Sequence, residues 1–202
     1  MVRYLADAAN AVTTAGLLLS TLGLYLALSG HPEFAIAVVL WAVLADHLDG
    51  VVASRARNRS VEVAKMGKSL DGFSDLVHGA VFPSVILIQI SSASYLSLFS
   101  AAVLLLAGAL RLSYFSNFGL STERRFMGVP ITYDVPLLAV LFLLRPWLAP
   151  DSFPPLLNAS FLVLATLHVA PIRVPAASGA MYGVIAAFGV GASTLLVVRG
   201  LA

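Results

Sequence analysis

Long apolar runs are the feature that most constrains the fold of this chain. Each run is close to the roughly 20 residues that an α-helix needs to cross the ~30 Å hydrocarbon core of a bilayer. The runs lie near residues 11–29, 34–53, 70–91, 94–116, 131–149, 155–171 and 176–198. Only short connections remain between them, which leaves no room for a soluble second domain. We therefore expect an all-α, polytopic membrane bundle of six core transmembrane helices plus an extra C-terminal helix, with residues 1–202 as one integral-membrane domain.

The composition excludes several classes of protein. Charged side chains make up 11% of the chain, against about 25% in soluble domains. The 12 basic and 10 acidic residues give a net charge of +2, which in an apolar chain orients helices and does not indicate nucleic-acid binding. The absence of cysteine excludes disulfides, thiolate metal sites and a cysteine nucleophile. The first run is longer than the ~7–15 residues of a signal-peptide core, so we expect a retained helix.

The positive charges predict the orientation of the bundle, because lysine and arginine are retained on the cytoplasmic side. They gather in the second and fourth connections, whereas the first and third connections carry none. The residues concerned are Arg55, Arg57, Arg59, Lys65 and Lys68, followed by Arg124 and Arg125. We therefore expect a protein of the cytoplasmic membrane, with its N-terminus on the cytoplasmic side.

Four aspartates stand in or beside apolar runs, where ionisable groups cost roughly 2.5–3.5 kcal/mol and usually mark a site. Asp46 and Asp49 are three residues apart, and Asp71 and Asp75 are four apart, so each pair shares one helix face. Both pairs flank the same cytoplasmic connection, and a helical hairpin would bring them together. Four carboxylates repel one another unless hard divalent cations neutralise them. The pattern predicts a two-metal site facing the cytoplasm that could act on a phosphoryl group.

Three other interpretations of these aspartates remain open. They could be helix-end residues that reach solvent, or isolated pairs neutralised by the nearby basic residues. A divalent-cation carrier or channel could also use membrane aspartates, but its acids would be spread across the membrane depth. Gly50, Gly67 and Gly72 favour a ligand slightly, since missing side chains let it approach the backbone.

The residues around the aspartates resemble the motif of the CDP-alcohol phosphotransferase family. That motif reads Asp-x-x-Asp-Gly-x-x-Ala-Arg, a short gap, then Gly-x-x-x-Asp-x-x-x-Asp, and it matches Asp46 to Ala53 followed by Gly67 to Asp75. Two departures stand out: Ser54 replaces the motif arginine, and the gap is about four residues longer than usual. Arg55 or Arg57 could supply the missing guanidinium.

Further segments resemble the phosphatidylserine synthase branch of that family over roughly residues 10–175. They are Asn10 to Thr13, Pro83, Leu110 to Asn117, Phe126 to Ile131 and Ile172 to Pro175. The departures from the branch pattern lie at His78-Gly79 and at Thr132 to Asp134.

The resemblance implies a phosphatidyltransferase that binds CDP-diacylglycerol and two Mg²⁺ or Mn²⁺ ions, and it suggests a homodimer. Asp46, Asp49, Asp71 and Asp75 would hold the metals, and Asp75 would also be the catalytic base. The implied contacts to the CDP-lipid are Asn10, Thr13, Gly50, Ala53, Arg57 and Gly67.

The acceptor that the resemblance implies is L-serine. Arg111 could bind its carboxylate, Tyr133 and Asp134 its ammonium group, and His78 could orient Asp75 or touch the acceptor. Each of these residues also has an alternative interpretation. Arg111 could snorkel to the interface, and Tyr133 could be an interfacial tyrosine. Asp134 could be a helix-end aspartate, and His78 a packed histidine. Glycerol 3-phosphate, inositol phosphate or another amino alcohol remain possible acceptors, and Arg124 and Arg125 leave a phosphorylated one open.

Overall fold

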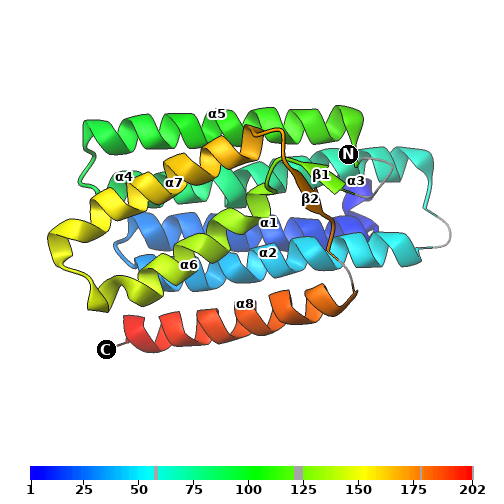
Figure 1. Ribbon diagram of the computed structural model, residues 1–202. Helices are drawn as coiled ribbons and strands as arrows, with labels where there is room; N and C mark the ends of the chain where they lie inside the picture. Colours follow the sequence, from blue (N-terminus) through cyan, green and yellow to red (C-terminus); the bar gives the residue numbers. More distant parts are fainter. Residues whose placement is uncertain (57–58, 121–124, 178, 202) are drawn as a thin grey trace.

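The structure, a computed structural model, describes residues 1–56, 59–120, 125–177 and 179–201. It is a bundle of antiparallel helices, as expected (Figure 1). The longer helices are α1 (Ala8–Leu28), α2 (Pro32–Arg55), α3 (Val61–Leu76), α4 (Phe82–Ile90), α5 (Tyr95–Phe118), α6 (Asp134–Leu144), α7 (Phe153–Val169) and α8 (Gly179–Gly200). Short 3-10 turns cover Val2–Ala6, Ile131–Tyr133, Arg145–Trp147 and Pro150–Ser152, and a π-helical turn, η2, covers Val77–Val81.

Within the described residues, six helical stretches are long and apolar enough to cross a membrane: 8–28, 32–55, 61–90, 95–118, 150–169 and 179–200. The run at 131–149, expected to be a span, forms the 11-residue helix α6 with a 3-10 turn at each end. Pro146 explains its early end, because it has no amide hydrogen to continue the helix and stands in the 3-10 turn that follows Leu144. The two termini lie at opposite ends of the bundle (Figure 1).

The third span begins earlier than expected, within the basic stretch. The Ser60 side chain caps α3 by accepting a hydrogen bond from the Val63 amide at 3.3 Å, which satisfies one of the unpaired amides of the first turn. The same span changes pitch at η2, where the amide of Phe82 bonds the carbonyl of Val77 five residues earlier. Pro83 accounts for this turn, because its ring would clash with the carbonyl four residues before it.

Small residues bring α1 and α2 together. A Cβ atom at Gly23 would lie 2.2 Å from a methyl carbon of Val39 and 3.3 Å from the carbonyl of Ala35, so only glycine permits this approach. Close contact between backbones is a common way for membrane helices to pack. Together with α3, this pair forms the frame that carries the four aspartates.

Two short strands, β1 (Arg125–Met127) and β2 (Arg173–Pro175), pair antiparallel with Phe126 opposite Val174. They lie at the end of the bundle where α2 ends and α3 begins (Figure 1). The strands bring together two of the segments that resemble the phosphatidylserine synthase branch, Phe126 to Ile131 and Ile172 to Pro175. Their pairing holds the connection that leads into α6 against the end of α7.

Candidate active site

The four aspartates converge at one end of the α2–α3 hairpin. One oxygen from each of Asp46, Asp49 and Asp71 lies within 4.8 Å of the other two. Asp46 also forms a second group of this size with Asp75 and His78. Both predicted pairs therefore contribute to one cluster, and Asp46 is common to its two halves.

The cluster contains buried polar atoms that fit a bound cation. Asp46 Oδ1, Asp75 Oδ1 and both ring nitrogens of His78 are buried without a hydrogen-bond partner among the described residues. Leaving such groups unpaired costs about 1–3 kcal/mol each, and more when they are charged. Carboxylate oxygens are the ligands that hard divalent cations prefer. The donor set therefore suits Mg²⁺ or Mn²⁺.

His78 enters the cluster from the π-helical turn. Its side chain is fully buried, and Nε2 lies 3.4 Å from Asp75 Oδ1. The wider turn between residues 77 and 81 carries His78, and such turns often occur at functional sites. The interpretation of His78 as a packed histidine with satisfied hydrogen bonds does not describe it, because Nε2 only faces Asp75 and neither nitrogen makes a hydrogen bond with a described residue.

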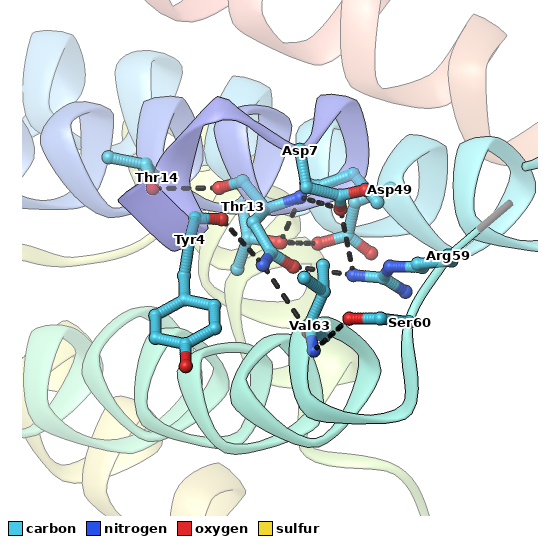
Figure 2. A network of polar contacts seen from close by, with 10 residues as sticks. Tyr4, Asp7, Thr13, Thr14, Asp49, Arg59, Ser60 and Val63 are labelled. Atoms are coloured by element: carbon cyan, nitrogen blue, oxygen red, sulfur yellow. Dashed lines mark hydrogen bonds and ion pairs between the residues drawn. The ribbon is translucent and has the colours of Figure 1, made fainter. Parts of the chain in front are cut away.

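A second polar network ties the start of α1 to the cluster (Figure 2). Asn10 and Thr13 are buried, and the Thr13 hydroxyl donates to Asp49 Oδ2. Arg59 donates to Asn10 Oδ1, and its Nη2 lies 3.0 Å from Asp7 Oδ1. In Figure 2, Arg59 reaches from the segment before Ser60 toward Asp7.

Gly67 is required by this network. A Cβ atom there would lie 2.3 Å from Asn10 Oδ1 and 2.4 Å from Arg59 Nη2. The guanidinium of Arg59 thus occupies the space that a side chain at Gly67 would fill. Gly50 has the opposite setting, because no described atom lies within 4 Å of its Cβ position. Ala53, one turn further along α2, is half-buried, so α2 presents an open surface beside Asp49.

Arg111 on α5 is buried, with 6% of the residue exposed. Its Nε donates to the Val129 carbonyl at 3.0 Å, and its guanidinium lies 5.2 Å and 5.7 Å from the ring centres of Phe126 and Phe115. This arginine does not snorkel to the interface. Its terminal amino groups donate to no described residue.

The structure separates the two neighbours expected to meet an ammonium group. Tyr133 is 43% exposed, whereas Asp134 is fully buried. The Asp134 carboxylate faces His168, with 3.0 Å between Oδ2 and Nε2. His168 is a residue that the sequence analysis did not identify, and its ring already pairs with the Asp134 carboxylate.

A family model for CDP-alcohol phosphatidyltransferase matches residues 6–190. The chain belongs to this family. The protein is an integral membrane protein, because its described residues form six apolar helices of spanning length and it belongs to this family.

Two curated proteins are similar to this family member. An archaetidylserine synthase of Methanothermobacter thermautotrophicus is 27% identical over 161 residues, which cover 78% of this chain and 65% of that protein. A CDP-diacylglycerol–serine O-phosphatidyltransferase of Methanocaldococcus jannaschii is 35% identical over 95 residues, which cover 47% of this chain and 43% of that protein. The chain thus spans less than two thirds of the length of either relative.

The motif arginine is missing from this chain, and a basic side chain other than Arg55 or Arg57 lies beside Asn10. Arg55 is exposed at the end of α2, and Arg57 lies outside the described residues. Arg59 is the basic side chain bonded beside Asn10. One feature of the sequence indicates a role for Arg59: the gap after Ala53 is longer than in the motif, and Arg59 directly precedes Ser60, the cap of α3.

Proposed function

We propose that this chain transfers the phosphatidyl group of CDP-diacylglycerol to the hydroxyl of L-serine, forming phosphatidylserine and CMP in phospholipid biosynthesis. The observation that carries this proposal is the cluster of four aspartates at one end of the α2–α3 hairpin, in a chain of the CDP-alcohol phosphatidyltransferase family. The reaction consumes one serine hydroxyl and releases CMP and one proton. A single membrane domain, with its core at about residues 10–175, would suffice for this chemistry.

The metal centre would be held by Asp46, Asp49, Asp71 and Asp75. Their two overlapping groups support two ions, Mg²⁺ or Mn²⁺. When bound, such ions neutralise the pyrophosphate and stabilise the leaving phosphate. The aspartates in turn position the donor at the end of the bundle.

Asp75 would take the proton from the acceptor hydroxyl. A general base must lie within hydrogen-bond reach of that proton, and Asp75 retains an oxygen without a hydrogen bond to any described residue. His78, with Nε2 at 3.4 Å from this oxygen, would orient the carboxylate. Attack by the hydroxyl oxygen on the lipid-side phosphorus forms the new ester bond, and the bond from this phosphorus to the bridging oxygen of CMP breaks.

The nucleotide side of the donor would lie against the α1–α2 surface. Gly50 and Ala53 leave room for the cytidine, while Asn10, Thr13 and Gly67 shape the adjoining wall. Arg59 would supply the cation for the donor phosphates, since its guanidinium is already fixed next to Asn10. The expectation for Arg57 stays a prediction, because that residue is not among those described.

The acceptor side would be read by Arg111, whose planar guanidinium suits a carboxylate. The names of both relatives include serine and differ in the lipid, which supports serine as the acceptor. Tyr133 is exposed enough to meet the ammonium group. Glycerol 3-phosphate, inositol phosphate and another amino alcohol are the alternative acceptors of the same chemistry.

The orientation and assembly are also proposals. Arg55, Arg59, Lys65 and Lys68 flank the aspartate cluster, which supports a cytoplasmic active site and N-terminus in the cytoplasmic membrane. A homodimer is the state that the family suggests. A divalent-cation carrier is the alternative from a different class, and the gathering of the four aspartates at one end of the α2–α3 hairpin argues against it.

An acceptor panel tests the proposed function. Purified protein is incubated with CDP-diacylglycerol, Mg²⁺ or Mn²⁺, and one acceptor at a time, and CMP release is measured. We expect the fastest release with L-serine and none in excess chelator. Faster release with a phosphorylated polyol would reassign the acceptor, and cation flux into vesicles without CMP release would favour the carrier.

A further inference from the structure

Asp134 and His168 form a buried pair outside the residues assigned to the metals and the nucleotide. Both side chains are fully buried, and His168 Nε2 lies 3.0 Å from Asp134 Oδ2 and 3.2 Å from Oδ1. Asp134 is the first residue of α6, and His168 lies one residue before the end of α7. The pair therefore links the two helices that follow the strand β1.

The other side of His168 is bonded to the loop that contacts Arg111. His168 Nδ1 lies 2.8 Å from the Val129 carbonyl oxygen, which also accepts from Arg111 Nε at 3.0 Å. One carbonyl thus receives two donors, one for each of its lone pairs. A continuous chain of hydrogen bonds runs from Asp134 through His168 and Val129 to Arg111.

The backbone around Val129 is fixed independently. The Val129 amide bonds the Leu167 carbonyl at 3.0 Å, and the Gly128 amide bonds the Ile172 carbonyl at 2.8 Å. Gly128 has φ of +73°, and a Cβ atom there would lie 2.0 Å from the His168 carbonyl oxygen. The loop is therefore pressed onto the end of α7, and the Val129 carbonyl has a defined direction.

The acceptors around His168 determine which of its ring nitrogens carries a hydrogen. A carbonyl only accepts, so His168 Nδ1 must carry a hydrogen to bond Val129. Nε2 then shares one proton with the Asp134 carboxyl group, whichever of the two holds it. The pair thus fixes the ring of His168 so that it always donates toward Val129, in the way that a carboxylate sets the tautomer of a histidine.

The consequence falls on Arg111. Its Nε is used by Val129, and Phe115 and Phe126 flank the guanidinium. The terminal amino groups, which donate to no described residue, are left as a fork of fixed direction. Such a fork matches the two oxygens of a carboxylate.

We propose that Asp134 and His168 are positioning residues for the acceptor: through the Val129 carbonyl they aim Arg111 at the carboxylate of an amino-acid acceptor. This inference rests on the proposed function. In this proposal Asp134 does not bind the ammonium group of the acceptor, contrary to the expectation from the sequence, but acts on Arg111 through His168 and the Val129 carbonyl.

The test compares steady-state kinetics of well-folded variants. His168→Leu breaks the hydrogen bonds that connect Asp134 to Val129. The double variant Asp134→Leu/His168→Leu removes both buried polar partners together, so that no unpaired carboxylate is left buried. His168→Asn is the conservative variant, since its side-chain amide can donate toward Val129. Asn158→Leu is the matched control: Asn158 is equally buried in α7 and donates to Ser91 and Pro154 near the other end of that helix.

We expect both leucine variants at His168 to raise the KM for serine about tenfold, the effect of one lost hydrogen bond, with the KM for CDP-diacylglycerol unchanged. His168→Asn should recover most of this loss. Adding Arg111→Ala to His168→Leu should raise the KM for serine no further than Arg111→Ala alone. Asn158→Leu should leave both constants unchanged.

An unchanged KM for serine in the folded double variant overturns the inference alone. So does an equal rise in the KM for CDP-diacylglycerol, or the same rise in Asn158→Leu. If the wild-type protein releases no CMP with any acceptor, the proposed function fails and this inference fails with it.

Discussion

Replacing Gly67 with alanine tests whether Arg59 is held where the donor phosphates would bind. A Cβ atom at this position would lie 2.3 Å from Asn10 Oδ1 and 2.4 Å from Arg59 Nη2. Both side chains must therefore shift, including that of Asn10, which is buried and whose amide also bonds the Tyr4 carbonyl at 2.9 Å. The substitution therefore breaks the bond between Arg59 and Asn10 and disturbs the ion pair between Arg59 and Asp7, while it leaves the four clustered aspartates in place.

The magnitude follows from two opposing effects. A hydrogen bond to a charged group contributes about 1.5–3 kcal/mol, whereas alanine gains about 1 kcal/mol over glycine within a helix. We expect Gly67→Ala to lower the free energy of unfolding by about 0.5–2 kcal/mol. Gly191→Ala in α8 is the matched control, because no described atom lies within 4 Å of its Cβ position and only the helix gain applies.

The assay combines thermal unfolding in detergent with the KM for CDP-diacylglycerol. Gly67→Ala should unfold below the wild type, and its KM for CDP-diacylglycerol should rise about 10-fold or more, as the loss of a phosphate contact of that strength implies. Gly191→Ala should unfold at or above the wild-type temperature with an unchanged KM. The role of Arg59 would be refuted if Gly67→Ala unfolded at the same temperature as Gly191→Ala and kept the wild-type KM for CDP-diacylglycerol.

Three further outcomes follow from the site. Asp71→Asn should abolish CMP release in a folded protein, as should excess chelator with the wild type, and substantial activity in either case would argue against a metal centre at this position. Asp75→Asn should lower kcat far more than it weakens CDP-diacylglycerol binding, whereas an equal loss of both would make Asp75 chiefly a metal ligand. Arg111→Ala should raise the KM for serine and spare the KM for CDP-diacylglycerol, and an unchanged KM for serine would remove Arg111 from the acceptor site.

The sequence predicted the parts of this protein that depend on local periodicity. The long apolar helices follow from their composition, and the convergence of Asp46, Asp49, Asp71 and Asp75 follows from helical spacing on either side of one connection. Ser60, three residues before Val63, was a local sign of where α3 begins. Pro146 is a similar sign that α6 ends early, and apolar periodicity alone carries neither boundary.

The parts that the sequence did not predict depend on the conformation of loops and on contacts between distant residues. Arg59 lies beside Asn10 because α1 and the first turns of α3 pack together around it, and its spacing from Ala53 does not determine this contact. His168 meets Asp134 and Val129 across gaps of 34 and 39 residues. No periodic pattern marks such a pair, since it forms only when β1 and β2 bring α6 and α7 together.

The most direct test of phosphatidyl transfer follows the serine oxygen. Purified protein is given CDP-diacylglycerol, Mg²⁺ and L-serine labelled with ¹⁸O in its hydroxyl group, and the products are analysed by mass spectrometry, with Asp71→Asn as the inactive control. Attack of the hydroxyl on the lipid-side phosphorus predicts that the label is found in phosphatidylserine and that CMP is unlabelled. Labelled nucleotide together with phosphatidic acid, or no labelled lipid at all, would contradict the proposed reaction.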